Sequence, residues 1–122
     1  MSWLAVAVGG AAGAVLRYAV ALALGPLRPG AVPWNTLAVN VAGSLLLGLV
    51  LSRVPLDDPR HLRPLLAVGF CGGLTTFSTF GYETLTLLQS RAWGTAVAYA
   101  GGSVVLSVVA VAIGISWGKR AY

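Results

Sequence analysis

Apolar residues occupy four long runs of this 122-residue chain, and short polar connections separate the runs. The runs cover about residues 3–24, 34–51, 64–88 and 93–117. Each run is long enough to cross the hydrocarbon core of a lipid bilayer as a helix, which takes roughly 20 residues. Gly25 and Pro26 favour a loop after the first run. The pattern predicts an all-α integral membrane protein, with residues 1–122 as a single domain of four transmembrane helices.

Composition and the places of the tryptophans support the membrane interpretation. Hydrophobic residues make up 57% of the chain and charged residues only 9%, whereas roughly a quarter of the residues of a soluble domain are charged. Each apolar run has a tryptophan at or near one end, where interfacial aromatic residues are common: Trp3, Trp34, Trp93 and Trp117. The first positive residue is Arg17, so we expect a first transmembrane helix rather than a cleaved signal peptide.

The net charge of +5 comes mainly from basic residues between or beyond the apolar runs, which is typical of membrane topology rather than nucleic-acid binding. No nucleic-acid partner is expected. One predicted side carries five basic residues: Arg53, Arg60, Arg63, Lys119 and Arg120. Arg28 and Arg91 lie on the other side, joined by Arg17 if its side chain reaches that way, and an excess of five over three permits insertion in both orientations. Arg17, inside the first run, either reaches an interface or contributes to an electropositive vestibule for anions.

Small residues four positions apart occur in the first two runs, as Gly9 with Gly13 and Ser44 with Gly48. Such pairs allow two helix backbones to approach each other closely. We expect this contact either between helices of one chain or between copies of the chain in a homo-oligomer.

Reactive side chains are too few for enzymatic chemistry. The chain has one cysteine, Cys71, one histidine, His61, and three acidic residues. No metal-ligand cluster and no pair of nucleophile and base can be assembled from them. We therefore expect a protein that is not an enzyme, in which Cys71 is a small packing residue.

Polar residues inside two apolar runs recur every four positions and so lie along one face of a helix. In the second run they are Thr36, Asn40 and Ser44, followed by Gly48, and in the fourth they are Tyr99, Ser103 and Ser107. The hydroxyl of an isolated serine or threonine can bond to its own helix. The amide of Asn40 needs more than its own helix, so it requires water or a partner on another helix.

The third run contains the stretch that is least suited to a continuous helix. Gly72 and Gly73, followed by Thr75 and Thr76, weaken the helix and predict a break near its middle. A break would release backbone carbonyls and amides near the bilayer midplane. Broken transmembrane helices use such groups to bind ions.

Beyond the predicted break, Phe77 and Phe80 share one face of the helix, while Thr76, Thr79 and Glu83 share another. Aromatic ring edges carry partial positive charge, so rings beside hydroxyl and amide donors suit a small anion. The chain offers no ring of acidic residues to select cations. The stretch therefore favours anion transport, with Glu83 either in a local network or titrating.

Three motifs, in this order, resemble the Fluc (CrcB) family of fluoride channels. The first runs from Gly9 to Tyr18 (GGAAGAVLRY), the second from Thr36 to Asn40 (TLAVN) with Gly43, and the third from Gly72 to Phe80 (GGLTTFSTF). The third motif is highly specific, and the resemblance covers essentially the whole chain. It implies passive, fluoride-specific efflux across the plasma membrane of a bacterial or archaeal cell, which lowers cytoplasmic fluoride and its toxicity.

The resemblance also implies a dual-topology assembly, in which two antiparallel subunits form a homodimer with two fluoride pores. Main-chain carbonyls of Gly72 and Thr75 from both subunits would bind a structural sodium ion (Na+) at the dimer centre. Six residues would line the fluoride pore: Phe77, Phe80, Asn40, Tyr99, Ser103 and Ser107. Three more would be associated with the pore: Glu83, Thr79 and Arg17.

One departure from the family pattern is Asn35, which stands before Thr36 where we expect glycine and which can alter the start of the second helix. Two other function classes fit parts of the sequence. A small four-helix multidrug-type exporter resembles this chain in size, but that class is built around a glutamate in its first helix, and the first run here has no acid. A non-transporting membrane subunit would explain the glycines but not the hydroxyl rows beside the third motif.

Overall fold

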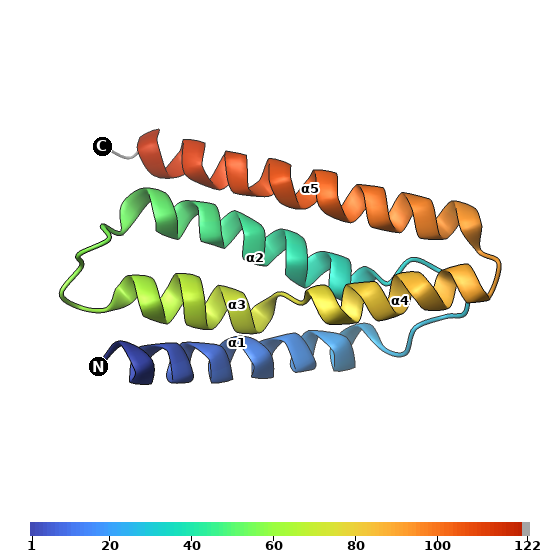
Figure 1. The fold of residues 1–122 in the computed structure, drawn as a ribbon, viewed down its shortest axis with the longest axis horizontal. Coiled ribbons are helices and arrows are strands. Elements are labelled where there is room, and N and C mark those ends of the chain that lie inside the picture. The colour runs from blue at the N-terminus through green and yellow to red at the C-terminus, as the bar shows by residue number, and fades with distance from the viewer. Residues whose placement is uncertain (121–122) are drawn as a thin grey trace.

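A computed structural model describes residues 1–120 of the chain and the side chains of residues 1–119. Residues 121 and 122 of the predicted domain lie outside the described residues. The described part is helical and contains no strand. Its elements in chain order (Figure 1) are α1 (Ser2–Leu24), α2 (Trp34–Arg53), η1 (Pro64–Cys71), α3 (Gly72–Leu74), α4 (Phe77–Gln89) and α5 (Trp93–Arg120).

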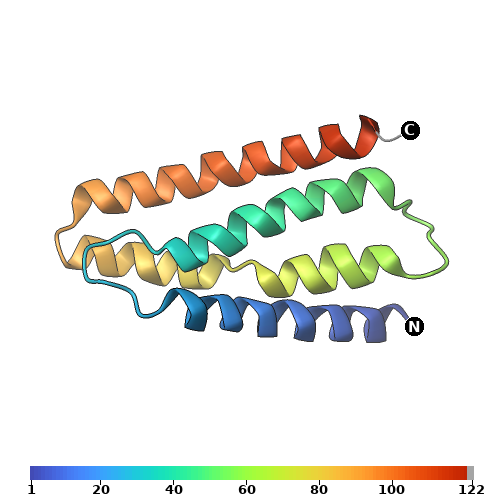
Figure 2. The same cartoon turned by 180° about the vertical axis from the view of Figure 1, so that it is seen from behind.

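The four predicted transmembrane helices are confirmed. α1, α2 and α5 are each long and apolar enough to cross a membrane, and so is Pro64–Gln89, which combines η1, α3 and α4 and is called the third segment below. The ends of the four spans lie within three residues of the predicted ones. The start of α1, the connection after α2 and the end of α5 lie at one end of the molecule, as predicted for four crossings (Figures 1 and 2).

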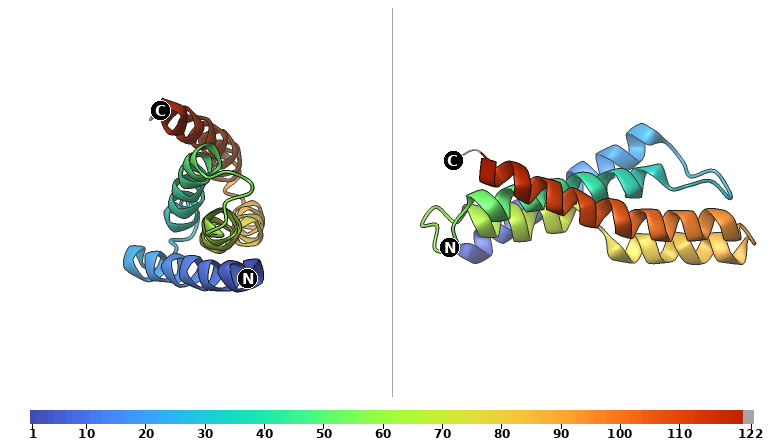
Figure 3. Two further views of the ribbon diagram at one scale, coloured as in Figure 1. Left: turned by 90° about the vertical axis from the view of Figure 1, so that its left-hand side faces the viewer. Right: turned by 90° about the horizontal axis from the view of Figure 1, so that it is seen from above.

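The packing of the helices leaves much apolar surface for lipid. α1 packs on η1 and α3, while α5 packs on α2 and on α4. The end-on view shows α1 and α5 at opposite edges, with α2 and the third segment between them (Figure 3). The four tryptophans are exposed near the helix ends, which fits side chains at the headgroup level of a bilayer.

Glycines bring α1 into backbone contact with the first half of the third segment. A Cβ on Gly9 would overlap the Leu65 carbonyl oxygen and lie 2.9 Å from the Phe70 nitrogen. A Cβ on Gly13 would overlap the Phe70 carbonyl oxygen and lie 2.7 Å from the Leu74 nitrogen. Neither position has room for a side chain. Of the two contacts expected for this pair, the structure contains the one within the chain.

The two residues of the second pair, Ser44 and Gly48, have different surroundings. Gly48 contacts α5, because a Cβ there would overlap the Val111 carbonyl oxygen and lie 3.1 Å from the Gly114 Cα. Ser44 lines a cavity instead. Gly48 therefore also makes a contact within the chain.

The third segment is broken, as predicted, but the break is not at its glycines. Gly72 and Gly73 lie in the helical turn of α3, and the chain becomes extended at Thr75 (φ −83°, ψ 157°) and Thr76 (φ −150°, ψ 122°). β-branched residues such as threonine favour this extended conformation. Gly73 serves packing, since a Cβ on it would overlap the Gly10 carbonyl oxygen. The break therefore lies within the predicted stretch from Gly72 to Thr76, at its threonines rather than at its glycines.

The connection between α2 and η1 is held by Asp58. Its carboxylate accepts a hydrogen bond from the Leu62 backbone nitrogen at 2.9 Å and pairs with the Arg60 Nε at 3.0 Å. The hydrogen bond from Leu62, followed by the neighbouring Arg60 guanidinium, holds the pKa of Asp58 below its ordinary value. This contact closes the turn that leads into the third segment.

Candidate functional site

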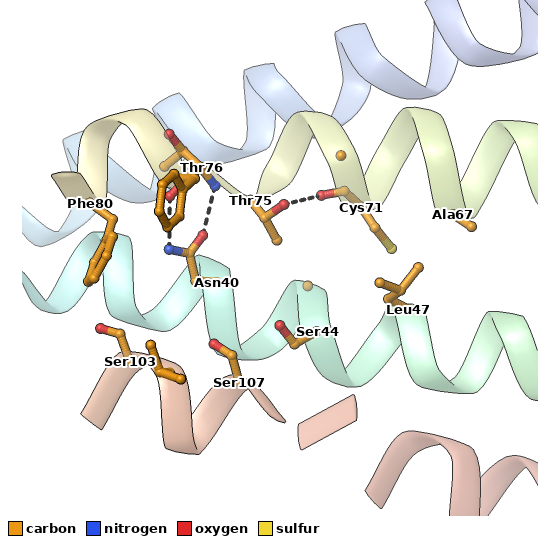
Figure 4. A pocket seen from close by; sticks show the side chains of 14 residues that line it. Asn40, Ser44, Leu47, Ala67, Cys71, Thr75, Thr76, Phe80, Ser103 and Ser107 are labelled. Atoms are coloured by element: carbon orange, nitrogen blue, oxygen red, sulfur yellow. Dashed lines mark hydrogen bonds between the residues drawn. The ribbon is translucent and has the colours of Figure 1, made fainter. Parts of the chain in front are cut away.

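Asn40 on α2 clamps the break in the third segment. Its Nδ2 donates to the Thr76 carbonyl oxygen at 3.0 Å, and its Oδ1 accepts from the Thr76 backbone nitrogen at 2.7 Å (Figure 4). One side-chain amide thus satisfies both backbone groups of a residue that lies between two helices. The amide of Asn40 therefore has a partner outside its own helix, as it requires, and this partner is the extended backbone of the break rather than a side chain.

The break also releases two carbonyl oxygens from the helix ladder. In an α-helix each backbone N–H bonds to the carbonyl four residues earlier. The Thr76 N–H would bond to Gly72 in that arrangement, but it bonds to Asn40. The Thr79 N–H would bond to Thr75, but it bonds to the Thr76 Oγ1 at 3.2 Å. The carbonyls of Gly72 and Thr75 therefore lose the partners that an unbroken helix would supply.

Arg17 on α1 binds the end of the helix that precedes the break. Its Nε donates to the Gly73 carbonyl oxygen at 3.1 Å, where the helix dipole favours a positive charge. The same residue lines a cavity of about 120 Å³ together with Asn35, Thr36 and Thr79. This arrangement fits a role inside the chain better than a side chain that only reaches an interface.

Asn35 leaves the start of the second helix where the sequence predicts it. α2 begins at Trp34, the residue before Asn35, as the sequence predicts. The Oδ1 of Asn35 is buried and has no hydrogen-bond partner among residues 1–119. The departure from glycine therefore adds a polar group beside Arg17 without moving the helix.

A second, larger cavity of about 330 Å³ lies between α2, the third segment and α5. Asn40 and Ser44 reach it from α2, and Ser103 and Ser107 reach it from α5 (Figure 4). The Oγ of Ser103 is buried and has no hydrogen-bond partner within the described part of the chain. A buried hydroxyl of this kind can be satisfied by water or a ligand in the cavity.

We call this larger cavity the pathway cavity. Two aromatic rings line it, those of Phe77 and Phe80, and a third ring, that of Tyr99, packs against Phe80. The ring centroids of Phe77 and Phe80 are 5.6 Å apart, and those of Phe80 and Tyr99 are 5.3 Å apart. The planes of both pairs are tilted, by 40° and 50°. Both phenylalanines line the pathway cavity, and Phe77 is 83% exposed. One wall of the cavity is therefore open in the isolated chain.

Glu83 lies in a local network, one of the two situations expected for it. It is only 5% exposed, its Oε1 accepts from the Thr36 hydroxyl at 2.8 Å, and its Oε2 accepts from the Tyr99 hydroxyl at 2.6 Å. The carboxyl group joins α2, α4 and α5 through these two bonds. Both of its oxygens have donors, as a carboxyl group at this depth requires.

Thr76 is the residue whose importance the sequence conceals. It holds Asn40 with its backbone, caps α4 by accepting from the Thr79 nitrogen, and donates from its hydroxyl to Thr79 Oγ1 at 3.1 Å. The sequence does indicate the capping role of Thr76, because threonine is a common N-cap at the start of a helix. The two bonds to Asn40 depend on tertiary structure and have no local signal.

Comparison with known proteins places this site in a family. A family model described as CrcB-like protein, camphor resistance (CrcB), matches residues 4–115. The chain belongs to this CrcB family. The match includes the break, both cavities and the rows of polar residues described above.

Two relatives in the CrcB family match this chain over nearly its full length. A protein of Paracoccus denitrificans named fluoride-specific ion channel FluC is 44% identical over 118 residues, which cover 97% of this chain and 94% of the relative. A protein of Nitrobacter winogradskyi with the same name is 48% identical over 120 residues, which cover 94% of this chain and 95% of the relative.

Proposed function

We propose that this chain is a fluoride-specific ion channel of the cell membrane. The observation that carries the proposal is the 44–48% identity, over nearly the whole length, with relatives named for that activity. The chain is a multi-pass membrane protein and not an enzyme. A cell loses fluoride through such a channel down the gradient, because fluoride that entered as the neutral weak acid leaves as the anion, and cytoplasmic fluoride and its toxicity fall.

The pathway cavity supplies the fluoride path. Phe77, Phe80, Asn40, Tyr99, Ser103 and Ser107 line or border it. Fluoride that sheds water needs donors and positive partial charge in return, which hydroxyls and aromatic ring edges provide. The unpartnered hydroxyl of Ser103 supports this role directly. The amide of Asn40 contributes chiefly by holding the break, because its Nδ2 and Oδ1 are both engaged at Thr76.

Three residues support the path without forming its wall. Glu83 fixes the Tyr99 hydroxyl by accepting its hydrogen bond. Thr79 belongs to the cap of α4, together with Thr76. Arg17 places a positive charge in the smaller cavity beside the break, where it attracts anions.

A structural sodium ion fits the released carbonyls of the break. Sodium prefers hard oxygen ligands, and the carbonyl oxygens of Gly72 and Thr75 lack their helical partners. Two carbonyls are too few for a complete coordination shell, so a second subunit would supply two more. When bound, the ion supplies positive charge at the centre of the assembly. The chain's own contribution is twofold: the clamp by Asn40 keeps the Gly72 carbonyl free, and the cap by the Thr76 hydroxyl keeps the Thr75 carbonyl free.

The second subunit is a copy of the same chain in the opposite orientation. Phe77, although 83% exposed, lines the pathway cavity. A partner placed against this wall would close the cavity and bring two breaks together. The weak charge bias between the two ends of the chain allows the antiparallel insertion that such a homodimer needs.

Parallel ion-selective electrodes test the function. Purified protein in liposomes is expected to release fluoride rapidly and chloride negligibly, whereas empty liposomes release neither. Equal release of both halides would contradict fluoride specificity. Proton-coupled uptake of organic cations would instead support the exporter class, and no transport of either kind would support a non-transporting subunit.

A further inference from the structure

A third cavity, of about 250 Å³, lies beneath the connection between α1 and α2. Arg28 and Gly30 of that connection line it, together with Glu83, Thr86 and Ser90 on and just after α4. We call it the outlet cavity. It has room for roughly eight waters at about 30 Å³ each.

Glu83 stands between the outlet cavity and the pathway cavity. It lines the former, and its Oε2 accepts the hydrogen bond from Tyr99. The Tyr99 ring in turn contacts Phe80, which lines the pathway cavity. Two direct contacts therefore connect the wall of one cavity to the wall of the other. A small anion that moved past Phe80, Tyr99 and Glu83 would leave the pathway cavity, where the Ser103 hydroxyl is free, and enter the outlet cavity, which is large enough for water.

We propose that the outlet cavity is one end of the fluoride path, at the end of the molecule where α2 begins and α4 ends. The proposal rests on the proposed channel function. Arg28 is exposed at this cavity, and its charge raises the local concentration of anions at the mouth. Fluoride regains its water here after it passes the ring of Phe80.

Charge at the mouth gives the first test. Arg28→Glu is expected to lower the single-channel fluoride current in planar bilayers about twofold at low ionic strength, and the loss shrinks at high salt because the charge is screened. Arg91→Glu is the matched control, because Arg91 lies in the turn after α4 but does not line the outlet cavity. Equal losses in the two variants, or no loss in Arg28→Glu, would overturn the assignment of Arg28 to the mouth.

Blocking the cavity gives the second test. Ser90→Cys, labelled to completion in detergent with sulfonatoethyl methanethiosulfonate, is expected to lose at least fivefold of the single-channel fluoride current, since a bulky anion then occupies the outlet. Labelled Gln89→Cys, one residue earlier and outside the cavity lining, keeps its current. Both variants carry Cys71→Ala, because Cys71, although buried, lines the pathway cavity, and the Cys71→Ala protein without a second cysteine is expected to keep its current after the same treatment.

The outcomes separate this proposal from the channel function. Full current through completely labelled Ser90→Cys, with the modification verified by mass spectrometry, would overturn the outlet while leaving a fluoride channel. Absence of fluoride current in the untreated wild type would instead overturn the channel function on which the outlet rests.

Discussion

The two halves of the third segment are held in opposite ways. Before the break, η1 and α3 lie against α1 through glycines whose missing side chains allow backbone to touch backbone. After the break, α4 is held by side chains, with Glu83 bonded to Thr36 on α2 and to Tyr99 on α5. One segment thus contains a tightly packed apolar half and a polar half beside cavities.

This difference explains where function can reside. Backbone contact leaves no space between α1 and the first half, so this half chiefly positions the second, and the polar group that the break releases from it is the Gly72 carbonyl. The second half keeps polar groups in the membrane at the cost of satisfying each one, and such groups tend to be functional. Asn40 acts at the boundary, where it satisfies both backbone groups of Thr76.

The largest expected effect comes from filling the glycine contact. Gly13→Ala places a Cβ onto the Phe70 carbonyl and 2.7 Å from the Leu74 nitrogen, and backbone cannot move aside cheaply. We expect the free energy of unfolding in detergent to fall by about 4 kcal/mol. Gly10→Ala is the control, since its Cβ would meet only the Gly69 oxygen at 3.9 Å and the gain in helix propensity is about 1 kcal/mol. Similar stabilities for the two variants would contradict the backbone contact.

Removing the Asn40 amide at the break should lower the free energy of unfolding somewhat less than Gly13→Ala does. Asn40→Leu leaves the Thr76 N–H without an acceptor and removes one donor from the Thr76 carbonyl, which is expected to lower the free energy of unfolding by about 3 kcal/mol. Asn40→Asp keeps the acceptor for the Thr76 N–H and should lose less. Denaturant titration of both variants measures the difference. A stable Asn40→Leu protein would show that another group satisfies Thr76.

Loss of one of the two hydrogen-bond donors to Glu83 should lower the free energy of unfolding less than loss of the Asn40 amide does. Tyr99→Phe removes the hydroxyl that donates to Glu83 and keeps the ring against Phe80. The expected loss of unfolding free energy is about 2 kcal/mol, because the buried carboxyl group keeps one of its two donors. Thr36→Val removes the other donor, and the double variant should deviate from additivity. Strict additivity would mean that the two donors do not share Glu83.

The smallest effect is expected outside both halves, at Asp58. Its pKa is held low in the folded chain by the Leu62 N–H and Arg60. Folding therefore gains stability from the ionised form above the ordinary pKa, and this gain is lost as the pH falls below about 4. The protection of the Leu62 amide against hydrogen exchange, measured relative to an unstructured chain at the same pH, should fall over that range, and Asp58→Asn should remove this pH dependence of the protection. A flat profile in the wild type would contradict the contact.

The sequence predicts the helices well because their signals are local. Runs of apolar residues, loop-forming Gly25 and terminal tryptophans place all four spans within three residues of their ends. The break is predicted in the correct stretch, from Gly72 to Thr76, but the sequence does not show which of these residues become extended, since intrinsic propensity does not tell glycines used for packing from glycines used for bending. In the structure Gly73 faces Gly10, and the threonines are extended.

The polar contacts are harder to predict because each joins positions distant in sequence. The four-residue spacing places Asn40 in the polar row of α2 and places Tyr99 and Ser103 in the polar row of α5. It does not identify the partners of these side chains. Thr36 meets Glu83 across 47 positions, and Arg17 meets Gly73 across 56. Such pairings follow from how the helices pack, which a single chain's periodicity does not specify.

Single-channel current through Phe80→Ile tests most directly whether the second half carries fluoride. The substitution keeps an apolar side chain but removes the ring that lines the pathway cavity and contacts Tyr99. We expect the fluoride current to fall at least tenfold while the unfolding midpoint and the Gly10→Ala current stay near wild type. A folded Phe80→Ile protein with wild-type fluoride current would contradict the account.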